Sequence, residues 1–410
     1  MKDIADKIIQ SVKSLPFSNE VIEKGGIIYH VGGFVRDLFL QKQSKDIDIV
    51  ISNIEINDLE EILSKYGKID SVGKSFGIIK FKSDKILGRI LETDIALPRI
   101  ERKISDGYTG FEVKSNHLIS IETDLERRDF SVNSIAIDHN GNITDPFGGV
   151  EDIKKSVIRM TNKDTFEDDP LRMIRAVQFA SRFNFKIEQN TLNSIKKNAE
   201  KIKQISFERV LIESDKIVKK GNKTIAAKLL HDSTLFNHIF DISNSNATIH
   251  DNIDSCSSVA EFIFLLLKTD FSNGSSIAEF FKTTLKGDIY GYKEIIALQL
   301  AETKTENELE NRLLVFKMNK IFPRILNSKI ISNNIKETID KMTELNIPFS
   351  IKELQINGDD LITLGIQGVK IGEMLDFTIK SIYDNKIKNN KEEILKFITN
   401  KLDNEKTILT

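Results

Sequence analysis

The spacing of apolar and polar residues divides the chain into a strand-rich front part and a helical remainder. Between about residues 26 and 150, short apolar runs rich in β-branched residues recur, as is typical of strands. These runs are IIYHVGG, DIDIVIS, GIIKFK, ILETDIALP and SVNSIAID. A helical stretch from Asp58 to Lys65 lies among them. The pattern therefore predicts an α/β or α+β domain at the front of the chain.

From about residue 151 onward the pattern is that of helices. Apolar residues recur with a period of about 3.6, and short polar loops separate the segments. Pro170 begins one helix, where its missing N–H costs nothing. Glu167, Asp168 and Asp169 are placed at that N-terminus, where the helix dipole favours acidic residues. A glycine-punctuated segment from Asn357 to Gly372 precedes lysine-rich helices.

Composition narrows the class of protein. The 410 residues suffice for about two to four domains, and 40% hydrophobic with 29% charged residues is ordinary for a globular protein. A net charge of −2 excludes a globally basic nucleic-acid binder, although 59 lysines and arginines can still form a local basic face. One cysteine, Cys256, excludes an internal disulfide and a cysteine-based zinc site. Without a signal-peptide core or an apolar run that could span a bilayer, a cytoplasmic location and no membrane partner are expected.

Asp46 and Asp48 stand two positions apart on a predicted strand. Residues two apart share one face of a strand, so the two carboxylates are expected side by side. Carboxylates that close repel each other and favour a shared proton or a cation. Mg²⁺ fits, since it is usually held by one or two carboxylates together with substrate phosphates. A solvated strand edge is the alternative, but aspartate is depleted in apolar strands such as this one.

A glycine turn precedes these aspartates. Gly32 and Gly33 follow an apolar strand, and Arg36 lies one turn into the next helix. A turn rich in backbone N–H groups beside a metal site suggests a nucleoside triphosphate. Most glycine pairs are only turns, so the prediction depends on their combination with the arginine and the aspartates.

Two other segments supply candidate ligands. Asp94 lies in a further strand-like run and could bring a third carboxylate, with Glu92 on the same face; a surface aspartate at a strand end is the alternative. The guanidinium group of Arg128 is suited to bidentate binding of phosphate oxygens, while Asp129 and Asn133 could accept hydrogen bonds from ribose hydroxyls. For this second segment the alternative is a surface cluster of salt bridges.

A third segment offers a way to select a base. Asp169 and Arg172 lie three residues apart on a helix and share a face, and Arg175 follows one turn later. Cytosine and adenine both present an exocyclic amino donor beside a ring-nitrogen acceptor. An aspartate acceptor beside an arginine donor matches that pattern and rejects uracil and guanine. A simple salt bridge is the alternative.

His231 and Asp232 invite comparison with metal-dependent phosphohydrolases. Such a site needs more histidine and aspartate ligands than the neighbouring helices supply. We therefore interpret the pair as a helix end.

Together these motifs resemble those of bacterial-type (class II) tRNA nucleotidyltransferases and the related bacterial poly(A) polymerases, and the CCA-adding members above all. The resembling segments are GGFVRDLFL, KDIDIVIS, LERRDFSVNSIAID, TDPFGGVEDI, FEDDPLRMIRAVQFASRFNF, SFERV and INGDDLITLGIQGVKIGEMLDFTIKSI. They cover about residues 28–215 and 356–397. Gln178 departs from the family, which often has arginine there, and this puts a phosphate or base contact at that position in doubt.

The resemblance implies an α+β fold, with a polymerase-β-like nucleotidyltransferase head followed by all-helical domains. The implied divisions are a catalytic head (1–155), a neck for base selection (156–215), a body (216–350) and a tRNA-binding tail (351–410). Asp46 and Asp48 would hold two Mg²⁺ ions, with Asp94 as a further catalytic carboxylate. The implied nucleotide-binding residues are Gly32, Gly33, Arg36, Arg128, Asp129, Asn133, Asp169, Arg172 and Arg175.

The activity implied is template-independent addition of CCA to the 3′ end of tRNA from CTP and ATP, by two-metal nucleotidyl transfer. CC-only addition, A-only addition and poly(A) synthesis are the alternatives within the family. The segment from Arg99 to Glu122 corresponds to the loop associated with the change from CTP to ATP, and its full length weighs against CC-only addition. A silent tRNA-binding protein and a small-molecule nucleotidyltransferase are alternatives from other classes.

Overall fold

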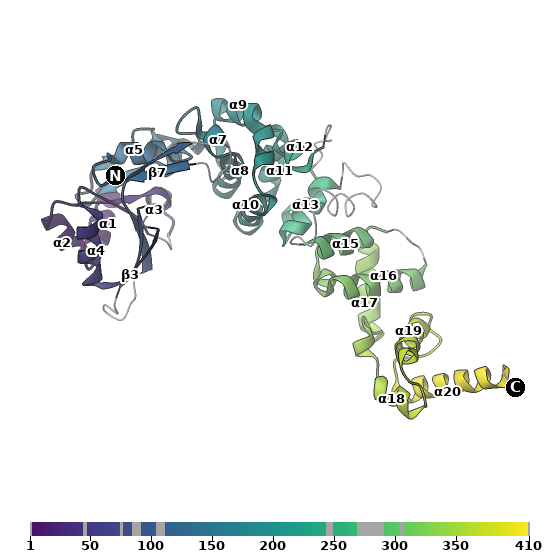
Figure 1. The fold of residues 1–410 in the computed structure, drawn as a ribbon. Helices are drawn as coiled ribbons and strands as arrows, with labels where there is room; N and C mark the ends of the chain where they lie inside the picture. Colours follow the sequence, from purple (N-terminus) through teal and green to yellow (C-terminus); the bar gives the residue numbers. More distant parts are fainter. Residues whose placement is uncertain are drawn as a thin grey trace. The chain divides into compact units, whose positions relative to one another are not determined.

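The structure is a computed structural model that describes residues 2–43, 47–73, 77–83, 92–103, 111–242, 249–268, 291–303, 305 and 307–408. Its contacts group the chain into two compact units, Met1–Ala247 and Thr248–Thr410 (Figure 1). The divisions expected at residues 155, 215 and 350 remain predictions.

The first unit begins with a seven-stranded mixed sheet in the order β3-β4-β5-β2-β1-β8-β9. Its strands are β1 (Ile27–Val31), β2 (Asp48–Ser52), β3 (Gly67–Gly73), β4 (Ile78–Ser83), β5 (Glu92–Ala96), β8 (Ala136–Asp138) and β9 (Ile143–Thr144). All five runs predicted as strands are found in it. The pairing of β2 with β5 is parallel, whereas the other pairings of this sheet are antiparallel.

A separate hairpin occupies most of the segment that was expected to be a loop. Strands β6 (Arg99–Lys103) and β7 (Phe111–Ser115) pair antiparallel, and residues 104–110 between them lie outside the described ranges. The sequence analysis did not predict these two strands, nor β3 and β9.

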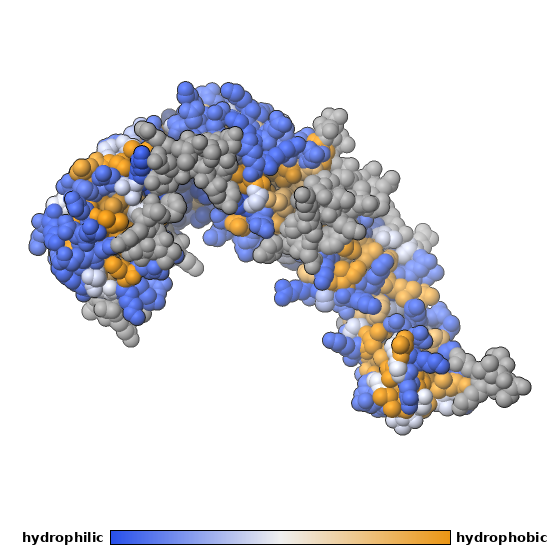
Figure 2. Space-filling view, viewed as in Figure 1, coloured by the Kyte–Doolittle hydropathy of each residue, from blue (hydrophilic) through white to orange (hydrophobic). Residues whose placement is uncertain are grey.

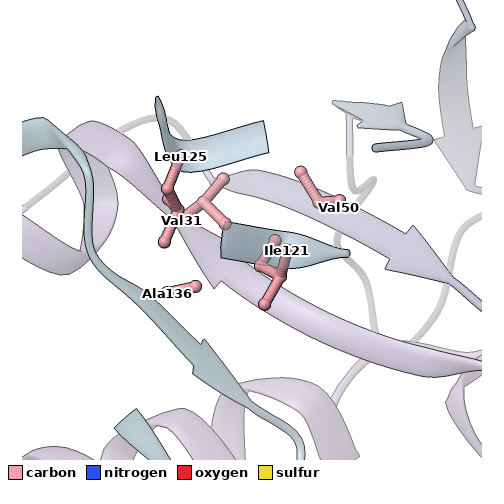
Figure 3. Packing of buried hydrophobic residues seen from close by; sticks show 5 residues of the cluster. All are labelled: Val31, Val50, Ile121, Leu125 and Ala136. Atoms are coloured by element: carbon pink, nitrogen blue, oxygen red, sulfur yellow. The ribbon is translucent and has the colours of Figure 1, made fainter. Parts of the chain in front are cut away.

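Helix α5 (Ile121–Glu126) packs on one face of the sheet (Figure 3). Its Ile121 and Leu125 lie one turn apart and form a buried cluster with Val31 of β1, Val50 of β2 and Ala136 of β8. Val50 is two residues from Asp48, so both side chains belong to the same face of β2. The packing of α5 therefore places the residues that follow it beside the aspartate at the start of β2.

Several helices complete the first unit. The α-helices are α1 (Lys2–Lys13), α2 (Ser18–Glu23), α3 (Gly32–Phe39), α4 (Ile56–Ser64), α6 (Gly149–Lys155), α7 (Thr165–Asp168), α8 (Leu171–Phe183), α9 (Gln189–Asn198), α10 (Phe207–Lys220), α11 (Lys223–Asp232) and α12 (Leu235–Phe240). Short 3₁₀ turns are Ser131–Asn133 and Ala199–Gln204. Two-residue strands β10 (Val157–Ile158) and β11 (Lys186–Ile187) pair in parallel, a small departure from the all-helical neck expected.

Two local expectations were tested within these helices. Glu167 and Asp168 belong to the short helix α7 and not to the first turn of α8. Asp169, which follows α7 and precedes α8, is extended and so separates the two helices. Asp169 instead accepts a hydrogen bond from the backbone N–H of Leu171, the first residue of α8, at 3.1 Å. The interpretation of His231 and Asp232 as a helix end is confirmed, since α11 ends at Asp232.

The second unit is helical throughout its described part. Its α-helices are α13 (Val259–Leu267), α15 (Tyr292–Ala301), α16 (Glu308–Ile321), α17 (Asn333–Glu344), α18 (Gly358–Thr363), α19 (Val369–Tyr383) and α20 (Lys391–Ile408). Short 3₁₀ turns are Ile253–Ser255, Pro323–Asn327 and Ile351–Glu353. On the face in Figure 2, hydrophobic residues gather over α15 to α19, and Val369 is 82% exposed. No helix in the described part of the chain is long and apolar enough to cross a membrane.

We expect His30 in β1 to make the stability of the first unit depend on pH. The side chain is fully buried, and neither ring nitrogen makes a hydrogen bond of normal geometry among the described residues. Burial lowers the pKa of His30 from 6.5 to about 4, and attraction to the backbone of Asp48 offsets this only in part. Above pH 6.5 the ring is neutral in both the folded and unfolded states, so it has no effect there.

As the pH falls from 6.5 toward about 4, only the unfolded chain takes up the proton. We therefore expect stability to fall by about 1.4 kcal/mol per pH unit in this range, and His30→Leu to remove that contribution. Urea unfolding of both proteins at about pH 7.5 and about pH 5 measures it. If the parent protein and His30→Leu lost the same amount of stability between the two pH values, His30 would not be the cause of the pH dependence.

Candidate active site

One pocket of about 500 Å³ in the first unit collects most of the predicted site residues. Residues from β2, α3, α8, α10 and the segment after α5 line it. The lining residues are Gly32, Gly33, Arg36, Asp48, Arg127, Arg128, Asp129, Asn133, Asp169, Leu171, Arg172, Arg175, Phe179, Arg182 and Arg209. Seven arginines against three aspartates make the pocket strongly positive, as suits a polyanionic ligand. All nine residues predicted to bind nucleotide are among them.

Asp48, one of the two predicted metal ligands, lines this pocket. Asp48 is the first residue of β2 and lies in register with Asp94 of the parallel strand β5. Paired residues of adjacent strands point to the same face, with the strands about 4.8 Å apart, so the two carboxylates are neighbours. Asp46 lies outside the described residues. Both Glu92 and Asp94 are exposed, but Glu92 forms an ion pair with Lys82, whereas Asp94 is in register with Asp48 and is the better placed carboxylate of β5.

The donor set fits a hard divalent cation. Asp48 and Asp94 offer carboxylate oxygens, which such cations prefer, beside a pocket suited to phosphates. Within the described ranges no three His, Cys, Asp or Glu side chains gather as a metal site. A cation bound there would therefore need further oxygens, from Asp46 or from a substrate.

The glycine turn between β1 and α3 lies directly against these charged groups. Gly32 has a φ of +65°, and a Cβ atom there would lie 2.8 Å from Nη1 of Arg128 and 3.2 Å from Oδ2 of Asp48. A Cβ atom on Gly33 would lie 3.4 Å from Nη2 of Arg36. The absence of side chains on the turn therefore allows the carboxylate and both guanidinium groups to approach the start of α3.

A chain of hydrogen bonds fixes two of the arginines. Arg36 donates through Nη1 to Oδ1 of Asn133 at 2.6 Å, and Nδ2 of Asn133 donates to Oδ1 of Asp129 at 2.9 Å. Arg175 donates through Nε and Nη2 to Oδ2 of Asp129 at 2.9 and 2.7 Å. Burial raises the pKa of Asp129, but the charge of Arg175 and the hydrogen bonds outweigh it and hold that pKa below its ordinary value. In this structure Asp129 and Asn133 thus hold the arginines in place; the ribose contacts predicted for them remain a prediction.

Asp124 in α5 has a similar role that the sequence analysis missed. Its fully buried carboxylate accepts hydrogen bonds from Arg127 at 2.8 and 3.0 Å and from Arg128 at 3.1 Å. Burial raises the pKa of Asp124, but the charges of Arg128 and Arg127 lower it below its ordinary value overall. The spacing of three and four residues to the two arginines was the available signal.

The expected base-reading residues, Asp169 and Arg172, both line the pocket. The prediction that they share a helix face was wrong, because Asp169 is extended and precedes α8. Oδ2 of Asp169 lies 3.5 Å from Nη2 of Arg209, a pocket residue from α10 that the sequence analysis did not assign. Arg172 donates to the backbone oxygen of Arg127 at 2.8 Å and more weakly to that of Thr165 at 3.4 Å. Among the described residues Asp169 thus pairs with Arg209 and not with Arg172, so the simple salt bridge considered as the alternative is not formed.

Helix α8 contributes a continuous stripe to the pocket. Arg172, Arg175, Phe179 and Arg182 follow one another at helical spacing, and all four line it. Gln178 is 2% exposed and is not a lining residue. The position at which the sequence departs from the family it resembles is therefore outside the pocket lining.

Three family models match successive parts of the chain. A poly(A) polymerase head domain matches residues 28–159, an RNA- and SrmB-binding site of polymerase A matches residues 184–244, and a tRNA nucleotidyltransferase domain 2 matches residues 263–398. The CCA-adding enzyme of Streptococcus uberis is 26% identical over 96% of this chain and 97% of its own length. That of Ligilactobacillus salivarius is 29% identical over 93% and 95%, respectively.

The crystal structure of the Bacillus stearothermophilus CCA-adding enzyme with CTP is similar in fold, with a TM-score of 0.73 at 24% identity. The similarity covers 96% of this chain and 98% of that one. The predicted α+β head followed by helical domains is thereby confirmed.

Asp94 and Glu92 share one strand face, so they form a matched pair for testing the carboxylate site. We expect Asp94→Asn to lower the rate of nucleotide addition about 10²-fold, because it removes a charge beside Asp48. Glu92→Gln, which removes a charge only two residues away, should stay within about twofold of the parent. Single-turnover rates of the two variants decide the matter, and equal losses would contradict the assignment of Asp94.

Proposed function

The chain belongs to the class II tRNA nucleotidyltransferase and poly(A) polymerase family, and we propose that it adds CCA to the 3′ end of tRNA from CTP and ATP without a template. The pocket of the first unit is the observation that carries this proposal. It combines a carboxylate pair at its edge, a set of arginines suited to a triphosphate, and an aspartate–arginine pair at one end. Similarity to enzymes named as CCA-adding over nearly the whole chain supports the same activity.

Selection of CTP and ATP falls to Asp169 and Arg172. Asp169 accepts from the exocyclic amino group that cytosine and adenine share, and Arg172 donates to the neighbouring ring nitrogen. Arg172 has donors to spare for this, since a guanidinium carries five and the described hydrogen bonds use two. The same pair rejects UTP and GTP. In uracil and guanine, the acceptor of Asp169 would face a carbonyl oxygen, and the donor of Arg172 would face a ring N–H group.

In the chemical step, the 3′-hydroxyl of the tRNA attacks the α-phosphate and pyrophosphate leaves. Gly32, Gly33 and Arg36 bind the phosphates, and Arg128, held by Asp124, offsets the charge that develops on them. Asp46 and Asp48 would hold Mg²⁺, with Asp94 beside Asp48. When bound, the ion lowers the pKa of the attacking hydroxyl and orients the triphosphate. Positioning and charge stabilisation are therefore the protein's main contributions.

Binding of the tRNA is assigned to the helical parts of the chain. The tail (351–410), which is rich in lysines, is the part proposed to bind tRNA. The head (1–155) and neck (156–215) would hold the nucleotide, and the body (216–350) would join them to the tail. A tRNA substrate fits the cytoplasmic location expected from the sequence.

The test is a gel assay with a tRNA transcript that ends at the discriminator base, Mg²⁺, and CTP or ATP singly and together. Addition of three residues only with both nucleotides would establish CCA addition. Addition of two residues from CTP alone, with no further step, would indicate a CC-adding enzyme. Activity only on transcripts that already end in CC would indicate an A-adding enzyme. An indefinite ladder from ATP would indicate a poly(A) polymerase, and no extension would refute the proposal.

A further inference from the structure

Three cations surround one aromatic ring at the end of α8. The guanidinium carbon of Arg36 lies 4.7 Å from the ring centroid of Phe183, the ammonium of Lys42 lies 4.8 Å from it, and the guanidinium carbon of Arg182 lies 4.9 Å from it. The ring attracts each cation through its π face, but it supplies no negative charge. Three like charges gathered in this way repel one another unless an anion joins them.

Only one of the three cations is neutralised by the described protein. Arg36 pairs with Asp37 through Nε and Nη2 at 2.9 and 2.7 Å. Arg182 and Lys42, by contrast, make no hydrogen bond or ion pair through their side chains with any residue in the described ranges. Burial is the main cause that lowers the pKa of Arg36; Asp37 and Asp129 raise it, and the charge of Arg182 lowers it.

The other arginines of the pocket all have acceptors. Arg127 and Arg128 share Asp124, Arg175 pairs with Asp129, Arg209 lies near Asp169, and Arg172 donates to backbone oxygens. Within the described part of the chain, Arg182 is therefore the one pocket arginine whose only assigned partner is an aromatic ring. The protein fixes the orientation of the others and leaves this charge available to a ligand.

Its position along α8 indicates which part of a nucleotide it meets. Arg172 and Arg182 are ten residues apart, which corresponds to about 15 Å along a helix. Arg172 lies at the base-reading end with Asp169, whereas Arg182 shares the Phe183 ring with Arg36, the arginine assigned to the triphosphate. A nucleotide with its base at Asp169 thus extends its phosphates toward Arg182.

We propose that Arg182 and Lys42, held around Phe183, bind the terminal phosphates of the incoming nucleoside triphosphate and the pyrophosphate that is released. This deepens the proposed function and rests on its assignment of the base-reading end. Both nucleotides carry the same phosphates, so the site adds affinity without distinguishing CTP from ATP. Arg182 and Lys42 are the specific additions to the residues assigned above.

Equilibrium binding of CTP, ATP, CMP, pyrophosphate and tRNA, each measured separately on the full chain, tests the proposal. Arg182→Gln should weaken CTP, ATP and pyrophosphate by about tenfold, while CMP stays within about twofold. Lys42→Gln should act in the same direction, and Arg182→Lys should retain most of the affinity because it keeps the charge. Arg324→Gln, which removes an exposed arginine of the second unit, is the matched control and should change none of these values.

Three results would overturn the proposal. An equal loss of CMP and CTP affinity would show that Arg182 supports the pocket as a whole. Weakened tRNA binding with unchanged CTP and pyrophosphate binding would assign Arg182 to the tRNA backbone. If Arg182→Gln left the binding of every ligand unchanged, Arg182 would contact none of these ligands. Because these measurements need no tRNA extension, failure of the CCA-addition proposal in the gel assay is distinguishable from failure here.

Discussion

Asp48→Asn is expected to lower the rate of nucleotide addition at least about 10³-fold while nucleotide binding is retained, a loss of about 4 kcal/mol in transition-state stabilisation. Asp48 lines the pocket, lies in register with Asp94 and closely approaches the glycine turn. Its replacement removes an oxygen ligand and a negative charge but keeps the shape of the side chain. The nucleotide should still bind, because the arginines and the base-reading pair are unaltered.

The measurement is the single-turnover rate of CMP addition to a tRNA transcript, together with the equilibrium affinity for CTP. Asp58→Asn, an exposed aspartate of α4, serves as the matched control and should leave both values within about twofold. Asp46→Ala is expected to behave as Asp48→Asn does, with binding retained and no measurable incorporation. Substantial residual addition by either variant would contradict the metal-ligand assignment.

Gly32→Ala is expected to lower the rate of addition at least about 10²-fold and stability by about 1–2 kcal/mol. The stability term comes from the φ of +65°, which a residue with a Cβ atom adopts only with strain. The rate term comes from displacement, because the new Cβ atom would lie 2.8 Å from Nη1 of Arg128 and 3.2 Å from Oδ2 of Asp48. Both groups must move, and even a small shift of positioning groups is costly.

Gly148→Ala separates the two terms. Gly148 has a φ of +71°, but a Cβ atom there would meet nothing within 4 Å. The control should therefore lose a similar amount of stability and keep its rate of addition. Thermal unfolding and single-turnover rates of the two variants provide the comparison, and equal rate losses would show that backbone strain alone explains the effect.

The sequence predicted the fold and the neighbourhood of the site because both depend on local spacing. Alternating apolar residues identified β1, β2 and β5. Arg172 lies on α8 as its helical pattern predicted, whereas Asp169 reaches the same pocket from the extended segment before that helix. The glycine turn followed by Arg36 was equally local. Each of these inferences needs only the period of a strand or a helix.

Features set by tertiary pairing could not be read in the same way. That Asp94 lies beside Asp48 depends on which strand pairs with β2 and in what register, and the choice between Asp94 and Glu92 is a question of register and not of composition. The contribution of Arg209 depends on the packing of α10 against α8. Asp124 carried a local signal, but only its complete burial shows that it holds two arginines of the pocket.

The ion pair of Asp129 with Arg175 also bears on how the first unit unfolds. Asp129 lies in the predicted head and Arg175 in the predicted neck, and Asp129 is buried. If the two parts separated, a buried carboxylate would lose its charged partner, a loss that typically costs about 3–5 kcal/mol. Head and neck are therefore best regarded as one cooperative folding unit, and a fragment that ends at residue 155 would contain half of an ion pair that it cannot complete.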